Sequence, residues 1–297
     1  MSVSPGNPAD SLKRIPTMKP TTPNATVIIA VYNHFEWLRL ILDALRMQTR
    51  KDFEIIIADD GSNPETVESI KTYMARHPEM DIRHSWQEDM GWRKNESLNK
   101  AVRASRSEYL IFVDGDCVPH PKFVEDHMRL RRRHCVVGGR RVDMSEDVSA
   151  MVENWDGLPE GYFGIVRKKV LSGIGQMAFG KVLSQLRRTM RMPFVFGKPV
   201  GTRPQGFLGC NMGMYKGDLE ELNGFDEDYV NPGTGEDTDL ELRWHNKGWE
   251  CMAVPRYALM LHRCHKRLPL DSPENKRILK RHEEENATWI ANGLVKE

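Results

Sequence analysis

The sequence predicts an α/β fold with one mostly parallel β-sheet that is flanked by helices. Three short apolar runs, at residues 26–31, 53–58 and 109–113, are typical of strands that are buried on both faces. Segments with apolar residues at helical spacing, such as 35–47 and 96–104, stand between these runs. Strands that alternate with helices form βαβ units, which place parallel strands in one sheet with helices on both of its faces.

Further elements continue this pattern along the chain. Pro64 opens a predicted helix that runs to Arg76, because proline is favourable in the first turn of a helix. Residues 81–86 are predicted as an additional strand. After residue 120 the pattern is less regular, and we expect a strand at 135–142, a helix at 236–247, strands at 249–254 and 257–261, and a charged helix after Pro273 that packs through Ile278, Trp289 and Ile290.

The bulk composition bounds the class of protein. A chain of 297 residues with 39% hydrophobic residues is long enough to bury a full core, as one large domain or two small ones. The formal net charge is +1, which gives no indication of a nucleic-acid partner. The longest apolar runs are far too short to span a bilayer.

The cysteines and the first residues bear on the compartment. Five cysteines, odd in number and never spaced as CxxC, argue against a disulfide framework and against a zinc knuckle. Residues 1–24 are rich in Pro, Ser and Thr and contain no apolar signal segment, so we expect a disordered leader. The sequence therefore predicts a cytoplasmic protein with a main domain over residues 25–266 and a helical tail over residues 267–297.

Two aspartates follow the strand predicted at 109–113, in the order Asp114-Gly115-Asp116. In open α/β sheets, ligands bind at the carboxyl ends of the strands. Two carboxylates one residue apart can share a hard divalent cation, which usually keeps phosphate oxygens of a substrate among its ligands. An acidic turn without a ligand is the alternative, because Asp and Gly are common turn residues.

A second acidic strand end is Asp59-Asp60-Gly61-Ser62. For Asp59 the favoured interpretation is a cap of the following helix, whereas Asp60 is a candidate ligand-binding residue. Receiver domains also gather acids at strand ends around a phosphoacceptor aspartate. This chain is much longer than such a domain, which disfavours that alternative.

Acids and histidines gather again near the end of the main domain. Four acidic residues within 236–241 follow the segment Pro232-Gly233-Thr234-Gly235. Acids suit a helix N-terminus through the macrodipole, but a partly desolvated carboxylate there can also act as a general base. His262 and His265 follow a predicted strand, and each is either structural or a metal ligand. Imidazole beside two carboxylates would favour Mn²⁺ over Mg²⁺.

The segment 161–217 contains ten Lys or Arg residues and no Asp or Glu. It can be a solvated helix face, an amphipathic segment on an anionic membrane, or a cover over the site that also binds an anionic acceptor. Both the membrane and the solvated interpretation stay open. The basic residues that flank apolar turns are Arg167, Lys168, Lys169, Arg187, Arg188 and Arg191.

Several short motifs occur together in one order along residues 26–266. They are Val31-Tyr32-Asn33, Asp59-Asp60-Gly61-Ser62, Gly91-Trp92-Arg93, Leu98-Asn99-Lys100-Ala101, the run from Tyr109 to Asp116, Gly209-Cys210-Asn211-Met212, the run from Asn223 to Glu227, and the run from Gly235 to Arg243. In this combination the chain resembles family 2 glycosyltransferases of the GT-A fold. It is most similar to bacterial members that carry a carboxyl-terminal galactosyltransferase-type segment.

The resemblance implies a Rossmann-like GT-A domain with a nucleotide-binding half at residues 25–120 and an acceptor-binding half at 121–266. It implies that Asp114 and Asp116 bind the diphosphate of a donor through Mn²⁺ or Mg²⁺, with His262 in the metal shell. His265 matches the second histidine of an HxxH pattern whose role is not assigned.

The resemblance also implies roles for the remaining motif residues. Asp237 is the implied catalytic base, and Glu236 is implied to orient the acceptor. The usual tryptophan before this pair is replaced by the segment 232–234. The residues implied to hold the nucleotide, directly or nearby, are Tyr32, Asn33, Asp60, Arg93, Asn99 and Asp114.

The expected activity is an inverting, metal-dependent transfer from a nucleotide sugar, with a UDP-sugar first, to a hydroxyl of a glycan or lipid-linked acceptor. Such a reaction would serve bacterial cell-surface polysaccharide synthesis. A nucleotidyltransferase is an alternative, but it needs a Gly-rich phosphate loop where this chain has residues 32–36 without glycine. A carbohydrate- or membrane-binding module that has lost turnover is the alternative outside enzymes.

Overall fold

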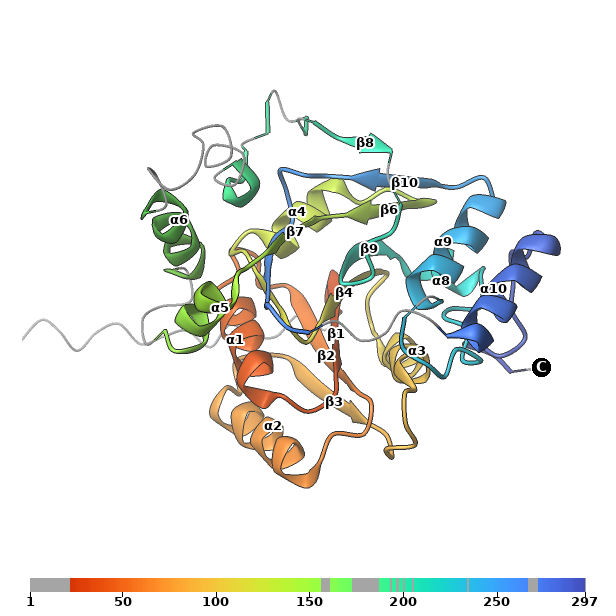
Figure 1. Cartoon of the computed structure of the whole chain (residues 1–297), viewed down its shortest axis with the longest axis horizontal. Coiled ribbons are helices and arrows are strands. Elements are labelled where there is room, and N and C mark those ends of the chain that lie inside the picture. Colours follow the sequence, from red (N-terminus) through yellow and green to blue (C-terminus); the bar gives the residue numbers. More distant parts are fainter. Residues whose placement is uncertain are drawn as a thin grey trace, which may run out of the picture.

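In the part of the chain that the structure describes, eight strands form one central sheet: β1 (Ala25–Val31), β2 (Phe53–Asp59), β3 (Ile82–Trp86), β4 (Tyr109–Asp114), β6 (Cys135–Gly138), β8 (Arg203–Pro204), β9 (Asn211–Tyr215) and β10 (Glu250–Ala253). Their order across the sheet is β3-β2-β1-β4-β9-β6-β10-β8 (Figure 1). The first four strands of the chain pair in parallel, and β9 is antiparallel to both of its neighbours. The predicted α/β fold with a mostly parallel sheet is confirmed.

The structure is a computed structural model. It describes residues 22–155, 161–172, 187–192, 194–195, 198–199, 201–204, 206–233, 235–266 and 272–296, without the side chain of Glu236. The predicted leader at 1–24 therefore lies almost entirely outside the described residues, as do residues 267–271 of the predicted tail.

The central strands form because their apolar runs are buried on both faces. In β1, Val27 and Ile29 face one apolar cluster, and Ile28 between them faces the other. Since successive side chains of a strand point to opposite faces, such a run is stable only when helices cover both sides. The run predicted at 81–86 lies at the edge of the sheet as β3, where most of its side chains are half-buried or exposed.

Helices cover both faces of the sheet (Figure 1). On one face lie α1 (Phe35–Arg46), α2 (Pro64–Arg76), α4 (Phe123–Leu130) and α5 (Glu146–Glu153), with α6 (Tyr162–Ser172) packed against α5. On the other lie α3 (Lys94–Ala104), α8 (Lys216–Glu220) and α9 (Glu236–Asn246), and α10 (Pro273–Glu284) packs against α9. The start of α2 follows its sequence signals, with Pro64 in the first turn and the Asn63 side chain accepting a hydrogen bond from the Thr66 N–H at 2.9 Å.

The strand predicted at 135–142 is in fact two strands that belong to different sheets. The chain leaves the central sheet after β6 and continues as β7 (Arg140–Asp143), which joins β5 (Cys117–Pro119) and β11 (Leu259–His262) in a small sheet of order β5-β11-β7. Gly139 lies at the change of sheet, and a Cβ there would lie 2.4 Å from the Ala258 carbonyl oxygen. A side chain at position 139 would therefore not fit without a shift of the neighbouring backbone.

The tail helix packs through polar residues rather than through the apolar side that the sequence predicts. Ile290 is buried and Ile278 is half-buried, but Trp289 is 40% exposed. The buried residues of α10 are Asn275 and His282. The prediction was wrong for Trp289 because α10 ends at Glu284, so Trp289 and Ile290 do not lie on the helix.

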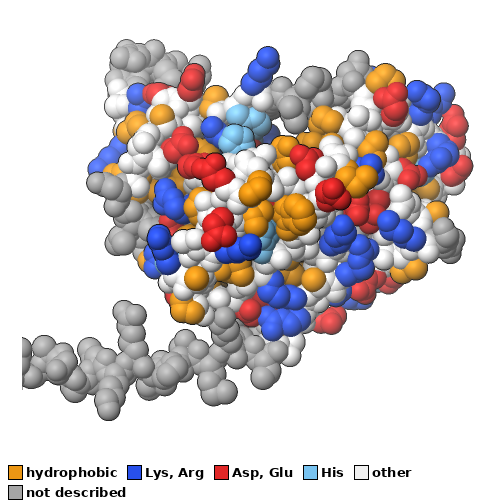
Figure 2. Space-filling view, turned by 90° about the horizontal axis from the view of Figure 1, so that it is seen from below, with side chains coloured by type: hydrophobic (Ala, Val, Ile, Leu, Met, Phe, Trp, Pro, Cys, Tyr) orange, Lys and Arg blue, Asp and Glu red, His pale blue; other side chains and the backbone are white. Residues whose placement is uncertain are grey.

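The basic segment 161–217 is described only in part, and several of its described cations are paired. Arg191 donates to both carboxylate oxygens of Asp126, which is fully buried, with its Nε at 3.0 and 2.9 Å. Lys169 pairs with Asp147 at 2.6 Å. None of the helices in the described part of the chain has both the length and the apolar character that crossing a bilayer requires. On the face shown in Figure 2, positive and negative side chains of the described residues are interspersed.

Candidate active site

A cavity of about 870 Å³ opens where β1 and β4 end, at the carboxyl edge of the parallel strands. Strand ends from the first half of the chain and loops from the second half both line it. The structure brings most of the sequence-predicted site residues to this cavity, namely Tyr32, Asn33, Asp60, Asp114, Asp116, Asp237 and His262.

The Asp114-Gly115-Asp116 segment turns directly at the end of β4. Asp114 is the last residue of β4 and pairs in register with Ala30 of β1. A Cβ on Gly115 would lie 2.8 Å from the Ala30 carbonyl oxygen, so the backbone of β1 leaves no room for a side chain. Glycine at this position lets both carboxylates face the cavity from one short turn.

Asp114 already has a cationic partner that the sequence did not single out. The Lys94 ammonium lies 2.9 Å from Asp114 Oδ1, and the two side chains are 15% and 32% exposed. Lys94 is the first residue of α3, directly after the Gly91-Trp92-Arg93 motif. A lysine at the start of a helix is usually solvated. Only the position of Lys94 directly after the Gly91-Trp92-Arg93 motif could have indicated its contact with Asp114.

Asp116 lies between two histidines. Its Oδ2 is 3.4 Å from His262 Nε2 and 2.9 Å from His265 Nε2. The other ring nitrogen of His262, Nδ1, lies 3.1 Å from Asp143 Oδ1. Burial acts to raise the pKa of Asp116, but the hydrogen bond and the charge of His262, with smaller contributions from Cys117 and His265, outweigh burial and lower the pKa to about 2.

The small sheet explains why these residues meet. In its register, His262 of β11 pairs with Cys117 of β5 and with Asp143 of β7. The Cys117 thiol also donates to Asp116 Oδ1 at 3.2 Å. Asp143 is a further neighbour of His262 that could not be predicted from the sequence. Its position depends on the division of the 135–142 segment into two strands.

The donor set fits a divalent cation. Ligand atoms of Asp116, Cys117 and His262 lie within 4.8 Å of one another. Asp114 lines the same cavity from the other side of Gly115. Carboxylate oxygens suit Mg²⁺ and Mn²⁺, and the imidazole shifts the preference toward Mn²⁺. Asp114 and Asp116 would hold the cation with His262, while Lys94 competes for Asp114.

The predicted nucleoside residues Tyr32, Asn33 and Asp60 line the same cavity. The Tyr32 hydroxyl donates to Asp89 Oδ2 at 3.0 Å, and Asn33 adopts a left-handed backbone with φ 57°. Asp60 accepts from the Gln87 side chain at 2.7 Å and from the backbone N–H of Arg93 at 2.8 Å. Burial raises the pKa of Asp60, and these hydrogen bonds offset that effect only in part.

Two predicted residues take other places. Arg93 is not among the residues that line the cavity and contacts Asp60 through its backbone. Asn99 is fully buried on α3, where its Nδ2 donates to the Phe225 carbonyl at 2.7 Å and to Glu227 Oε1 at 2.9 Å. Its Oδ1 accepts from the Phe225 N–H at 3.0 Å. In this structure Asn99 therefore holds the loop at 225–227 instead of facing the cavity.

The acidic helix start brings Asp237 to the cavity. Asp237 lies in the first turn of α9, and its Oδ2 accepts a long hydrogen bond of 3.2 Å from the Gly209 N–H. Asp237, Asp114 and Lys94 also line one small recess together. The side chain of Glu236, the other predicted catalytic residue, lies outside the described part of the structure.

Comparisons with known proteins agree with this arrangement. The family model described as glycosyl transferase family 2 matches residues 26–183, and the model described as N-terminal domain of galactosyltransferase matches residues 200–266. Validoxylamine A glucosyltransferase of Streptomyces hygroscopicus subsp. jinggangensis is 26% identical over 236 residues, which cover 76% of this chain and 52% of that protein. Chondroitin synthase of Escherichia coli is 26% identical over 239 residues, covering 75% and 32%. The chain thus spans about half the length of these relatives or less.

Solved structures share the fold at low sequence identity. The mannosyltransferase PcManGT of Pyrobaculum calidifontis, in complex with GDP-Man and Mn²⁺, aligns with TM-score 0.51 and 18% identity over 91% of this chain and 63% of that one. GalNAc-T7 with UDP, GalNAc and Mn²⁺ aligns with TM-score 0.60 and 14% identity over 89% and 50%. TarS 1-349 of S. aureus in complex with UDP aligns with TM-score 0.57 and 15% identity over 89% and 65%. At these identities the likeness shows the GT-A fold alone.

Proposed function

The chain belongs to glycosyl transferase family 2, and on this premise we propose that it is an inverting, metal-dependent glycosyltransferase. It moves a sugar from a nucleoside diphosphate to a hydroxyl of a glycan or lipid-linked acceptor. The observation that carries the proposal is that Asp114, Asp116, His262 and Asp237 line one cavity at the carboxyl edge of the sheet.

The proposed mechanism follows from where charge develops. When bound at Asp114, Asp116 and His262, Mn²⁺ or Mg²⁺ supplies the positive charge that stabilises a diphosphate leaving group. Lys94 adds a second positive charge on the same side of the cavity. Tyr32, Asn33 and Asp60 hold the nucleoside in the same cavity.

Asp237 is the carboxylate best suited to take the proton from the acceptor hydroxyl. Its hydrogen bonds among the described residues are long, at 3.2 Å from the Gly209 N–H and 3.4 Å from the Thr238 hydroxyl. The other cavity aspartates have shorter contacts to a lysine, a histidine, a tyrosine or a glutamine. A single base of this kind supports one displacement with inversion at the anomeric carbon.

A UDP-sugar is the first choice of donor. Two of the three solved structures named above hold UDP, and one holds GDP-Man. Chondroitin synthase among the relatives supports a place in bacterial cell-surface polysaccharide synthesis. We place the reaction in the cytoplasm. Contact of the basic residues in 161–217 with the inner face of the membrane is the alternative to a solvated surface for this segment.

A thermal-shift screen tests the donor. Nucleotide sugars with UDP, GDP or dTDP are added with and without Mn²⁺, and a matching donor raises the melting temperature only with the metal, because ligands stabilise the state that binds them. No shift with any donor would contradict the proposal.

Two further experiments test the alternatives. Slow Mn²⁺-dependent hydrolysis of the matching donor separates an enzyme from a binding module without turnover. Sedimentation with anionic liposomes at low salt tests the membrane contact.

A further inference from the structure

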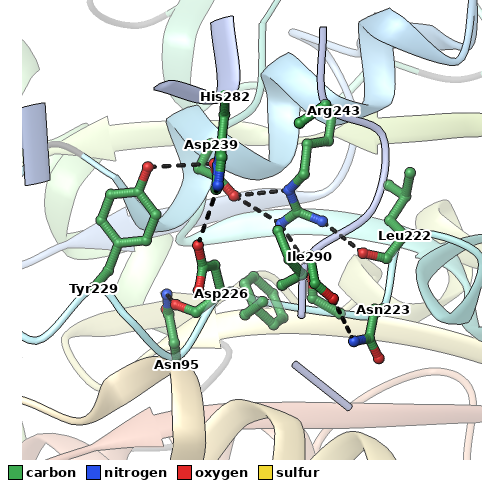
Figure 3. Close-up of polar contacts among 12 residues, drawn as sticks. Asn95, Leu222, Asn223, Asp226, Tyr229, Asp239, Arg243, His282 and Ile290 are labelled. Carbon is green, nitrogen blue, oxygen red and sulfur yellow. Dashed lines mark hydrogen bonds and ion pairs between the residues drawn. The ribbon is translucent and has the colours of Figure 1, made fainter. Parts of the chain in front are cut away.

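A buried polar cluster joins the C-terminal helix to the helix that carries Asp237 (Figure 3). His282 of α10 lies between two aspartates, with Nδ1 2.6 Å from Asp239 Oδ1 and Nε2 3.8 Å from Asp226 Oδ2. Arg243 lies one turn after Asp239 on α9 and donates from its Nε to Asp239 Oδ2 at 2.8 Å. The side chains of all four residues are at most 6% exposed.

Asp239 is the carboxylate of this cluster with the closest partners. It pairs with the Arg243 guanidinium and contacts the His282 ring, and a buried charge is stable only when it is paired. The remaining Arg243 N–H groups donate to the carbonyls of Leu222 at 2.8 Å and Gly224 at 3.0 Å. The ligand atoms of Asp226, Asp239 and His282 are also close enough for a cation. Because the Arg243 guanidinium already pairs with Asp239, we assign no metal ion to this cluster.

The same C-terminal segment holds the loop that leads to the cavity. The Asn275 side chain of α10 donates to the Asn231 carbonyl at 2.9 Å, directly before Pro232 and Gly233, which line the cavity. Further along, Asn223 donates to the carbonyls of Ile290 at 2.7 Å and Val295 at 2.8 Å. The loop before α9 is thus fixed from the C-terminal side at both of its ends.

Asp239 connects the cluster to Asp237 within one helical turn. The Asp239 N–H donates to the Gly235 carbonyl at 3.0 Å, which begins the hydrogen bonding of α9. The Tyr229 hydroxyl donates to Asp239 Oδ1 at 3.3 Å. A Cβ on Gly235 would lie 2.0 Å from Cδ1 of the Tyr229 ring, so the ring occupies the space beside Gly235. His282, Tyr229 and Asp239 therefore fix the backbone on both sides of Asp237.

We propose that His282 is a positioning residue of the active site, which fixes Asp237 at the cavity by holding Asp239 in the first turn of α9. The C-terminal segment 272–296 is then part of the catalytic structure. This inference rests on the proposed function, because it takes Asp237 as the base. Loss of the His282–Asp239 hydrogen bond would displace the base while leaving the residues of the donor site in place.

The first experiment compares kinetic constants of the full chain. We expect His282→Ala to lower kcat on the order of 10- to 100-fold, as small misplacements of catalytic groups do, with donor KM within about twofold. His282→Asn places an amide N–H near the position of Nδ1 and should recover most of kcat. His245→Ala, an exposed histidine on α9, is the matched control and should match the wild type. Unchanged kcat in His282→Ala, or equal loss in both His282 variants, would overturn the inference.

The second experiment does not require turnover. Hydrogen–deuterium exchange should be faster at the amides of 235–240 in His282→Ala than in the wild type, and unchanged in β1, β2 and β4. Equal exchange at 235–240 would overturn the inference even if transfer were found. Absence of transfer by the wild type with every donor would instead contradict the proposed function, so the two failures are distinguishable.

Discussion

Lys94 and Asp114 form an ion pair with 2.9 Å between Nζ and Oδ1, inside the cavity and at the carboxyl end of β4. The ammonium thus lies beside one of the two carboxylates that we assign to a divalent cation. A lysine there has two opposite effects, because it repels a cation and attracts a diphosphate. The balance between metal and donor binding is therefore set in part by Lys94.

Substitution Lys94→Met should tighten the binding of Mn²⁺ alone. A unit charge a few ångströms from a divalent cation costs on the order of several kcal/mol at the effective dielectric of protein surfaces, so even a strongly screened effect gives several-fold tighter binding. Isothermal titration with MnCl₂ measures it. Lys71→Met, an exposed lysine on α2, is the control, and equal or weaker Mn²⁺ affinity in Lys94→Met would contradict the prediction.

Substitution Asp237→Asn should abolish transfer and leave donor binding nearly intact. General-base catalysis contributes roughly 10²- to 10⁴-fold, and the amide cannot accept the proton. Initial rates with donor and acceptor measure the loss, while titration of the donor with Mn²⁺ measures binding. Asp147→Asn, at an exposed aspartate of α5, should behave as the wild type. Near-normal turnover of Asp237→Asn would mean that another group is the base.

His262 should matter more to the metal than His265 does. His262 is held by β11 and by Asp143, with its side chain 13% exposed, whereas His265 is 38% exposed and lies beyond the strand. We expect the Mn²⁺-dependent thermal shift caused by UDP to decrease strongly in His262→Ala and less in His265→Ala, because a fixed ligand binds at lower entropic cost. The reverse order would reject the assignment of His262.

Glu54 is a buried ion-pair centre far from the cavity, and Glu54→Gln should affect stability alone. Its carboxylate is fully buried and contacts Arg83 Nη2 at 2.6 Å and Arg106 Nε at 2.8 Å. Because both arginines are partly exposed to solvent, we expect the loss of these charged hydrogen bonds to cost about 1–3 kcal/mol in the free energy of unfolding. Chemical denaturation measures this loss, and unchanged donor KM is the control.

The Glu54 contribution should also depend on pH. Burial acts to raise the pKa of Glu54, but hydrogen bonds from Arg106, Thr26 and Arg83 outweigh it and lower the pKa below 4.5. A carboxyl group whose pKa is lowered in the folded state stabilises that state at pH values above 4.5. This stabilisation is lost as the pH falls through the folded-state pKa. The difference between wild type and Glu54→Gln should therefore narrow below pH 4.5, and a difference that grows there would contradict this explanation.

Asp226 should show the opposite pH dependence. Burial is the main cause that raises its pKa from 3.8 to about 6. A carboxyl group whose pKa is raised in the folded state stabilises that state at pH values below its unfolded-state pKa. This stabilisation is lost as the pH rises through the folded-state pKa. Asp226→Asn should thus raise the melting temperature at pH 8, with a gain of at most about 3 kcal/mol, and the gain should vanish near pH 4. No gain at pH 8 would contradict the prediction.

The parts of the site that the sequence predicts are those set by local pattern. An apolar run followed by an acidic residue places Asp60 and Asp114 at a strand end, because strand burial and chain direction follow from nearby residues alone. His262 could be named because it follows a strand and matches a known motif position.

The parts that the sequence does not predict depend on contacts between distant segments. Asn99 is a polar residue on a predicted helix, and its burial results from a loop more than a hundred residues later. The small sheet combines β5, β7 and β11, which come from distant parts of the chain. His282 lies in a charged helix that the sequence predicts to pack through its apolar residues, so its contact with Asp239 could not be inferred from the local pattern.

The C-terminal cluster also fixes when the site is completed during synthesis. Asp237 leaves the ribosome before His282 does, and the Arg103 side chain meets the Leu294 carbonyl across 191 positions of sequence. A nascent chain that has already formed β1 to β4 therefore carries the acidic strand ends without a fixed base beside them. On the proposed function, efficient sugar transfer therefore requires that α10 has docked on α9.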